Sequence, residues 1–366
     1  MNTIPYPNNP IEAVTAPDPY PFYRQLTAKR PLYFDAALDL WVAASADAVT
    51  AILSDPACRV RPTQEPVPKT LIHSPAAEIF SRLVRMNDGQ QNLVLKEAIV
   101  ETLRAVQHLE ERCIILAQTF DTCESISFQL PVCVMADLLG FPSETWPQIG
   151  AWVRDFVRCL SPLCSADEIT WGKQAAVQLL EFADDWLSEG LFKQLLLQAI
   201  KVQINDSNVV AANAIGFITQ AYEAAAGLIG NTLVCLARQP ELLPQVRRDP
   251  ALLRTVITEI SRLDPSVQNT RRYVADDGTI AGQAMQAGDA ILVLLAAANH
   301  DPAANGQQFA FGIGVHACPG ERFATSIAYA GLTQSLNLLD NDALIAYASS
   351  FAYQPSINAR IPIFKG

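Results

Sequence analysis

The chain has 366 residues, of which 50% are apolar and 17% charged, and its formal net charge at pH 7 is −11. This composition supports a large buried core and excludes a disordered chain. The acidic balance supplies no basic stripe to neutralise phosphates, so nucleic acid is excluded as an expected partner. The start, MNTIPYPNNP, lacks a signal-peptide pattern, and no apolar stretch is long enough to span a bilayer. We therefore expect a cytoplasmic protein that does not enter a membrane.

The N-terminal part of the chain carries signals for short helices around a β-hairpin. Helices are expected over residues 18–29 and 47–53. The bulky apolar segments PLYFD and LWVAA predict the two strands of the hairpin between them. Residues 57–78 are rich in proline and weakly periodic, which predicts a long irregular loop of the kind that is usually functional or mobile.

Helical periodicity then dominates as far as Pro240. We expect helices over residues 93–120, 130–141, 145–160, 166–200, 206–238 and 250–263. Strand-like pieces follow at residues 273–274, 278–280 and 290–295, and again in the tail FAYQPSINARIPIF, while a last helix begins near Pro319. No repeat or linker interrupts the pattern. The sequence therefore predicts one mainly helical domain, residues 1–366, with a small β portion.

One segment near the C-terminus, FAFGIGVHACPGERF, concentrates the residues that could carry chemistry. Three glycines within nine residues allow tight turns or the close approach of a flat ligand. A thiolate at Cys318 would be stabilised by the positive end of the helix that follows it. These features suit haem ligated by cysteine, and they also suit a cysteine nucleophile. A nucleophile would need a histidine base, and His316 is too close in the sequence for that role.

The other cysteines and the metal alternatives are less informative. Zinc would need three or four ligands at fixed spacing, and no such set accompanies Cys318. The remaining seven cysteines never form a C-x-x-C pair, so we expect them to be buried free thiols in a reducing compartment.

The segment FGIGVHACPG, residues 311–320, is similar at each defining position to the haem-binding loop of the cytochrome P450 family, F-x-x-G-x-H-x-C-x-G. The resemblance implies a cytochrome P450-like fold and a bound haem b, iron protoporphyrin IX. It implies that Cys318 is the axial iron ligand, that Phe311 packs beside the thiolate and that His316 lies near a haem propionate. Gly320 matches the last glycine of the motif.

The resemblance extends over roughly residues 18–366. The segment EISR supplies Glu259 and Arg262, which match the family's E-x-x-R pair and imply a structural ion pair on one helix face. The segment DPSVQNTRRYV resembles the bacterial sequence that follows this helix, and it implies that Arg272 reaches a propionate. The segment AANHDP resembles A-A-N-R-D-P, with His300 in place of the arginine.

The chain departs from the family in the helix expected over the haem. The family's A/G-G-x-D/E-T-T pattern corresponds here to residues 220–225. The acid is kept as Glu223, but Ala224 stands where the family has a threonine that relays protons together with that acid. An alanine methyl offers no such donor. Whether Glu223 faces the haem or has a purely structural partner stays open.

Two further departures concern the support of the haem. In DGQQNLVLK the family's propionate-binding histidine and arginine are replaced by Asn92 and Lys96, which can both donate hydrogen bonds. Only residues 303–310 separate Pro302 from Phe311, where the family has a longer segment. We therefore expect a weaker scaffold on the cysteine side of the haem.

The resemblance also implies which segments surround the substrate. Most of these side chains are small or apolar, which suits a small and largely apolar molecule. The residues are Leu71, Ile72, Leu83, Ala221, Val267, Asn269 and Ile357.

Taken together, the resemblance implies a haem-thiolate oxidoreductase of the monooxygenase type. It would oxidise a small metabolite, in keeping with secondary metabolism, with electrons from a separate ferredoxin or flavoprotein. Because Ala224 lacks the usual hydroxyl, protons would come from Glu223 through water or from the substrate, or peroxide would replace dioxygen. Two alternatives remain: a non-hydroxylating reaction such as coupling, dehydration, rearrangement or nitrogen-oxide chemistry, and a haem- or ligand-binding relative without turnover.

Overall fold

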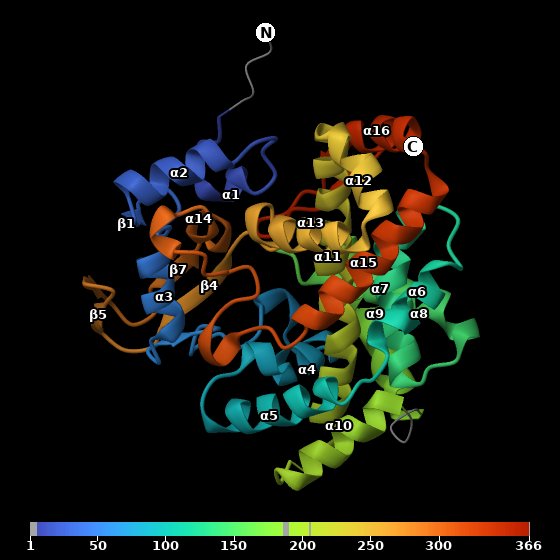
Figure 1. The fold of residues 1–366 in the computed structure, drawn as a ribbon. Helices are drawn as coiled ribbons and strands as arrows, with labels where there is room; N and C mark the ends of the chain where they lie inside the picture. Colours follow the sequence, from blue (N-terminus) through green and yellow to red (C-terminus); the bar gives the residue numbers. More distant parts are fainter. Residues whose placement is uncertain (1–5, 186–189, 205, 366) are drawn as a thin grey trace. The chain divides into compact units, whose positions relative to one another are not determined.

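The computed structural model describes residues 6–185, 190–204 and 206–365, and its chain divides into two compact units (Figure 1). The sheet unit comprises Met1–Gln64, Gly230–Cys318 and Asn341–Gly366. The helical unit comprises Glu65–Ile229 and Pro319–Asp340. The fold is mainly helical with a small β portion, which confirms the predicted fold class. The single domain over residues 1–366 stays a prediction.

The sheet unit is built on five strands in the order β1-β2-β7-β4-β3. Their bounds are β1 Leu32–Asp35, β2 Leu40–Ala43, β3 Cys58–Arg59, β4 Thr270–Val274 and β7 Ala290–Val293. The predicted hairpin is confirmed, since β1 and β2 pair antiparallel. Strand β7 then joins β2 in parallel, with Val42 opposite Leu292, and pairs antiparallel with β4. Strand β7 therefore lies in the centre of the sheet, between β2 and β4.

Helices cover both faces of this sheet. Alternate residues of a strand point to opposite faces, so Leu292 and Val293 enter different cores. Leu292 packs with Phe22 and Tyr23 of α2 (Tyr20–Lys29), whereas Val293 packs with Ile52 of α3 (Ala46–Ser54). Helix α2 lies within the predicted segment 18–29, and α3 extends the predicted segment 47–53 by one residue at each end.

The rest of the sheet unit consists of helices and two short hairpins. The helices are α1 Pro10–Ala13, α12 Leu243–Arg248, α13 Pro250–Leu263, α14 Leu295–Asn299 and α16 Asn341–Ser349, together with the end of α11. The hairpins are β5 Gly278–Ile280 with β6 Gln283–Met285, and β8 Phe351–Tyr353 with β9 Pro362–Phe364. Helix α13 confirms the prediction for residues 250–263, whereas α12 and α16 were not predicted.

The helical unit packs long helices against one another. They are α4 Pro75–Arg82, α5 Gln90–Arg104, α6 Leu109–Ala117, α7 Cys123–Leu139, α8 Trp146–Cys159, α9 Ala166–Asp185, α10 Gly190–Lys201, α11 Ser207–Arg238 up to Ile229, and α15 Glu321–Leu338. Helix α15 packs on α6 and α7, and α8 packs on α9. A Cβ placed on Gly172 of α9 would lie 2.2 Å from Cβ of Cys159, so glycine permits this close approach. None of the described helices combines the length and apolarity that a membrane span needs.

Several predicted bounds in this unit were wrong for identifiable reasons. The loop expected over residues 57–78 ends early, because Ser74 accepts a hydrogen bond from the Ala77 amide and starts α4. The helix expected over 93–120 is interrupted after Arg104, and His108 adopts a left-handed conformation with φ 52°. Helix α7 begins at the Thr122 cap rather than at 130, but it ends at Gly140, as predicted. The helix expected over 166–200 corresponds to α9 and α10, and residues 186–189 lie outside the described part.

Candidate functional site

The segment from Phe309 to Cys318 folds into a closed backbone loop. The Gly312 amide donates to the Phe309 carbonyl at 2.8 Å, and the Cys318 amide donates to the Phe311 carbonyl at 2.7 Å. Gly312 and Gly314 have φ of 66° and 67°, which glycine adopts without the steric penalty of a side chain. The two glycines therefore let the chain turn back so that Cys318 is held at the end of the loop.

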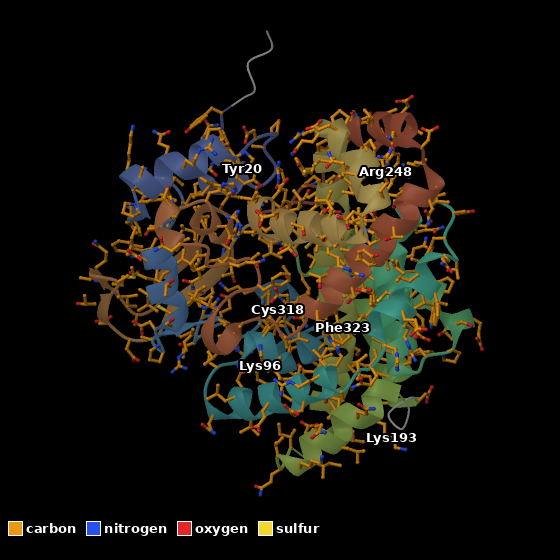
Figure 2. All side chains as sticks on the ribbon, viewed as in Figure 1. Tyr20, Lys96, Lys193, Arg248, Cys318 and Phe323 are labelled. Atoms are coloured by element: carbon orange, nitrogen blue, oxygen red, sulfur yellow. The ribbon has the colours of Figure 1, made fainter. Side chains whose placement is uncertain are left out.

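Cys318, which is labelled in Figure 2, differs from the other cysteines in its exposure. It is exposed, whereas the other seven are buried or half-buried free thiols, which broadly matches the prediction for them. Burial raises the pKa of Cys58, Cys113 and Cys159 to about 12, and that of Cys133 to about 11. These buried thiols therefore resist conversion to the thiolate that binds a metal. The Cys318 thiol, in contrast, is accessible to a ligand.

The other residues of the loop motif lie close to Cys318 along the chain. Phe311 and His316 are half-buried, and His316 ends a short 3₁₀ helix, Gly314–His316. Gly320 is the N-cap of α15, so the helix begins three residues after Cys318, in the region where the sequence predicted a helix start. The contacts of Phe311 and His316 with a haem stay predictions.

Two amide side chains that sequence reasoning gave no role hold the segment before this loop. The Phe309 amide donates to Oδ1 of Asn299 at 2.7 Å. Nε2 of Gln308 donates to Oγ of Ser261, in α13, at 2.9 Å. Arg262 also donates to the Asn299 carbonyl at 3.5 Å. The short segment 303–310 is therefore fastened to α13 and α14 by hydrogen bonds.

Glu259 and Arg262 form an ion pair along one face of α13. The Nη2 of Arg262 lies 2.9 Å from Oε2 of Glu259, and their side chains are 30% and 49% exposed. A partly exposed pair at i,i+3 contributes only about 0.3–0.5 kcal/mol. The hydrogen bond from Arg262 to the Asn299 carbonyl links this pair to α14, and the Asn299 side chain in turn accepts from Phe309.

Arg272 is held inside the five-stranded sheet. It lies on β4 opposite Ile291, is 5% exposed, and donates from Nη1 to the Arg271 carbonyl at 2.8 Å. A buried guanidinium is suited to pairing with a carboxylate. The contact with a propionate stays a prediction.

Two segments predicted to contact substrate lie side by side in the sheet unit. The Gln268 amide donates to the Asn358 carbonyl at 2.8 Å, and Val267 forms a β-bridge with Ala359. Nδ2 of Asn269 also donates to the Ile357 carbonyl at 2.9 Å. The structure thus brings together Val267, Asn269 and Ile357.

The other predicted substrate residues belong to the helical unit. Leu83 packs against α11, because a Cβ on Gly216 would lie 2.7 Å from its Cδ2. Leu71 and Leu83 are fully buried, Ile72 is 45% exposed and Ala221 is half-buried. The described contacts place Leu83 against α11, the helix that carries Ala221, and the role of all four residues in binding stays a prediction.

Glu223 and Ala224 are half-buried on α11, next to Tyr222. Burial, and secondarily the Glu223 carboxylate, raises the pKa of Tyr222 to about 12. The Tyr222 ring lies 5.6 Å from that of Phe128 in α7. Tyr222 is therefore a neutral phenol at physiological pH, and Glu223 is the acidic side chain beside Ala224.

Asn92 and Lys96 lie on α5. Asn92 is 4% exposed, and its Nδ2 donates to the Asn87 carbonyl at the start of the helix. Lys96 is half-buried. The amide of Asn92 thus closes the turn before α5, and its predicted contact with a propionate would use its remaining donor capacity.

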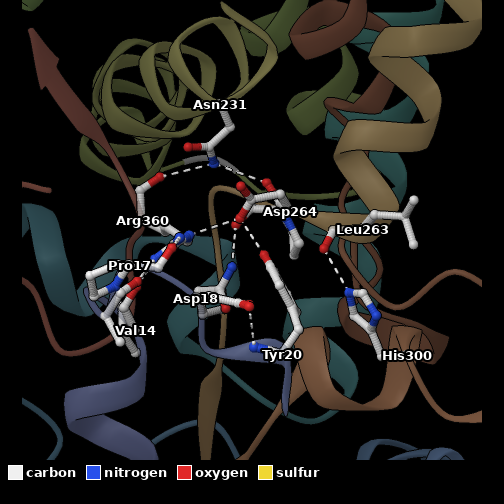
Figure 3. Close-up of polar contacts among 12 residues, drawn as sticks. Val14, Pro17, Asp18, Tyr20, Asn231, Leu263, Asp264, His300 and Arg360 are labelled. Carbon is white, nitrogen blue, oxygen red and sulfur yellow. Dashed lines mark hydrogen bonds and ion pairs between the residues drawn. The ribbon is translucent and has the colours of Figure 1, made fainter. Parts of the chain in front are cut away.

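A buried arginine cluster forms a second polar site that the sequence did not predict (Figure 3). Arg360 is 1% exposed and pairs with Asp264 at 2.8 Å. Its Nη1 donates to the Val14 and Ala16 carbonyls at 3.0 and 2.6 Å, and the Tyr20 hydroxyl also donates to Asp264. The cluster fastens both chain ends to α13. The signal in the sequence was an arginine within the apolar tail INARIPIF.

The accessible thiol and the glycine loop, within a mainly helical fold, fit the haem-thiolate class. Cys318 offers one soft ligand, and the loop glycines add no side chain beside it, so these residues fit a flat macrocycle that supplies the remaining ligands of iron.

No protein-family model matches the chain, whereas curated relatives and solved structures are similar to it. The biotin biosynthesis cytochrome P450 of Bacillus subtilis is 24% identical, over 88% of this chain and 91% of the relative. The mycinamicin VIII C21 methyl hydroxylase of Micromonospora griseorubida is also 24% identical, over 88% of each. The structure of P450BioI with an acyl carrier protein ligated to hexadec-9Z-enoic acid has a TM-score of 0.80 at 22% identity, covering 94% and 97% of the two chains.

These curated relatives are named cytochrome P450 or act as hydroxylases, and bacterial P450 structures share the fold, which together support the chain as a bacterial-type cytochrome P450. It is therefore an enzyme, and the cofactor of its family is haem b. This confirms the family, the class of enzyme and the cofactor that the sequence predicted, and it disfavours the alternative without turnover. The roles of the individual site residues are not decided by these relatives.

Proposed function

We propose that this P450 is a monooxygenase that oxidises a small, largely apolar metabolite, with Cys318 as the axial ligand of haem iron. The observation that carries the proposal is the exposed Cys318, whose amide is fixed by the Phe311 carbonyl while the other cysteines are buried or half-buried. When bound, haem supplies the chemistry that oxidises substrate with dioxygen. Phe311 would pack beside the thiolate, and the donors of His316 and Arg272 would pair with propionates.

The absorption spectrum of the reduced, carbon-monoxide-bound protein tests the ligand. We expect the red-shifted Soret band of thiolate ligation in the wild type and in Cys164→Ala, which alters a half-buried cysteine of the helical unit. Cys318→Ala should bind haem without that band. A thiolate band that persists in Cys318→Ala would assign the ligand to another cysteine and overturn the proposal.

We further propose that Glu223 delivers protons through water, without the help of a hydroxyl at position 224. The support is chemical: Ala224 offers no donor, and Glu223 is the adjacent carboxylic acid on α11. Oxidation of one substrate molecule with dioxygen consumes two protons together with two electrons, so a poor proton supply would lower the yield of product per electron consumed. Peroxide as oxidant would bypass this supply.

Ala224→Thr and Glu223→Gln test this proposal by the ratio of product to electrons consumed. Glu223→Gln should lower that ratio with a redox partner and leave turnover with hydrogen peroxide much less affected. Ala224→Thr should raise it if the relay is incomplete. Equal ratios for the wild type and Glu223→Gln would remove Glu223 from the proton path, and the substrate would then be the donor to examine.

Ala224 also favours a second candidate function, a non-hydroxylating P450 reaction in which the relay is dispensable. Coupling removes two hydrogens from the substrate, dehydration removes water, and rearrangement leaves the mass unchanged. Hydroxylation instead adds one oxygen. The product mass therefore separates the two candidates once a substrate that shifts the haem spectrum is found.

The predicted pocket residues and the relatives support the proposed substrate class. Val267, Ile357 and Ala221 supply small or apolar surface, which suits an apolar small molecule. The P450BioI structure contains an acyl chain on a carrier protein, so a tethered acyl chain is one form to test. Spin-state titrations with a free fatty acid, the same acyl group on a carrier protein, and a metabolite panel would separate these forms.

The electron donor in this proposal is a separate ferredoxin or flavoprotein, and the setting is the cytoplasm. A monooxygenase needs two electrons for each product, and haem by itself does not store them. Reduction by NADPH should therefore require an added ferredoxin with its reductase, or a flavoprotein. Rapid reduction by NADPH without either would contradict this part of the proposal.

A further inference from the structure

A series of hydrogen bonds leads from α13 and α14 to the cysteine loop, entirely within the sheet unit. Gln308 is bound to Ser261 of α13, and the next residue, Phe309, is bound through its amide to Asn299 at the end of α14. Phe309 is fully buried, and its carbonyl accepts from the Gly312 amide at 2.8 Å. Gln308, bound to Ser261, and Phe309, bound to Asn299, therefore fix the position at which the loop begins.

The loop itself transmits that position to the thiol. The left-handed turn at Gly312 follows directly on the bond to Phe309, and the Phe311 carbonyl then accepts from the Cys318 amide at 2.7 Å. A displacement of Phe309 would move the turn and with it the carbonyl that orients Cys318. The path from Asn299 to Cys318 thus consists of one hydrogen bond from a backbone amide to a side chain, two backbone hydrogen bonds and one short turn.

The hydrogen bonds of the Asn299 side chain distinguish a positioning role from a contribution to the stability of the fold. It is 3% exposed, and its Oδ1 accepts from Phe309, but its Nδ2 has no hydrogen-bond partner among the described residues. A buried donor without a partner destabilises the folded state and offsets much of what the other hydrogen bond contributes. The amide at this position is therefore better explained by where it holds the loop than by how strongly it stabilises the fold.

We propose that Asn299 and Gln308 are positioning residues that aim the Cys318 thiolate at haem iron by fixing Phe309. The inference rests on the proposed role of Cys318 as the iron ligand. Asn299 fixes the backbone amide of Phe309, and Gln308 fixes the preceding residue to α13. Neither side chain touches haem or substrate in this proposal, and each acts through the loop.

The first test uses the haem-loaded protein and the shape of its reduced carbon-monoxide spectrum. Asn299→Ala and Gln308→Ala should convert part of the thiolate-type band into the band of a protonated or lost thiol ligand. Asn299→Asp keeps an acceptor for the Phe309 amide beside Arg262, so it should restore most of the thiolate band. Gln307→Ala, at the exposed neighbouring position, is the matched control and should resemble the wild type.

The second test needs no haem and follows the loop directly. In the haem-free protein, Asn299→Ala should make the Gly312 and Cys318 amides exchange with deuterium about fivefold to tenfold faster, which corresponds to the loss of one ordinary hydrogen bond. Gln308→Ala should have a smaller effect in the same direction, and it serves as the second variant if Asn299→Ala folds poorly. Gln307→Ala should leave the exchange of both amides unchanged.

The outcomes separate this inference from the proposed function. A wild type without any thiolate band, with the loop still loosened in Asn299→Ala, would refute the role of Cys318 but uphold the positioning of the loop. A normal thiolate band and wild-type exchange in both Asn299→Ala and Gln308→Ala would overturn the inference while leaving the iron ligand intact.

Discussion

Replacing Arg360 with leucine should destabilise the protein strongly. The guanidinium is 1% exposed, and each of its three nitrogens donates a hydrogen bond. It pairs with Asp264 at 2.8 Å and donates to the Val14 and Ala16 carbonyls. Removing one partner of a buried ion pair costs about 3–5 kcal/mol. The Asp264 side chain is 15% exposed and keeps the hydrogen bond from Tyr20, so its charge is partly compensated. We therefore expect the free energy of unfolding to fall by an amount near the lower end of this range, about 3 kcal/mol. The free energy of unfolding of a native protein is typically about 5–15 kcal/mol in total.

Urea unfolding followed by far-ultraviolet circular dichroism and by tryptophan fluorescence measures this loss. Arg112→Leu is the control, because its 2.8 Å ion pair with Asp137 is 47% and 30% exposed and should contribute less than about 1 kcal/mol. Asp264→Asn combined with Arg360→Leu should cost less than the sum of the two single changes, since neither charge is then left unpaired. A loss below about 1 kcal/mol for Arg360→Leu, or full additivity in the double variant, would refute the reasoning.

Three further predictions concern a histidine, a glycine and the thiol. Burial lowers the pKa of His300 below its ordinary value of 6.5, so the imidazole of the unfolded chain is protonated at a higher pH than that of the folded chain. The free energy of unfolding should therefore fall as the pH drops below about 6.5. His300→Gln should lack this part of the pH dependence. Gly172→Ala should lower the free energy of unfolding by about 1–3 kcal/mol, because its Cβ would lie 2.2 Å from Cβ of Cys159. Gly150→Ala, whose Cβ would meet no atom closer than 4.0 Å, should raise it by about 0.5–1 kcal/mol, and equal effects would contradict the packing at Gly172. Iodoacetamide should label Cys318 first in the haem-free protein, as peptide mass spectrometry would report, and faster labelling of a buried cysteine would contradict the exposure described.

Local signals predicted much of the secondary structure because they act within a few residues. Gly140 ends its helix in a left-handed conformation with φ 90°, and Asp249 caps α13 through its side chain. The order of the five strands could not be predicted in the same way. The parallel pairing of Val42 with Leu292 joins segments 250 residues apart, and it depends on helices that pack on both faces of the sheet. Such register is set by tertiary contacts.

The candidate site shows the same division between local and distant signals. The glycines around Cys318 predicted a turn, and the loop has it, because a positive φ depends on the residue itself. Asn299 and Gln308 gave no such signal, since amide side chains are usually exposed and only the fold brings them to Phe309 and Ser261. Arg360 was missed for the same reason.

The arginine cluster also determines when the sheet unit can be completed during synthesis. Arg360 donates to the Pro17 carbonyl across 343 residues of chain, and the sheet unit includes residues from both termini. At about 5–20 residues per second, the ribosome needs about 17–70 s to make the chain between these two residues. The carbonyls of Val14, Ala16 and Pro17 therefore lack this partner until Arg360 has been synthesised. The sheet unit can be completed only after Arg360 has left the ribosomal tunnel.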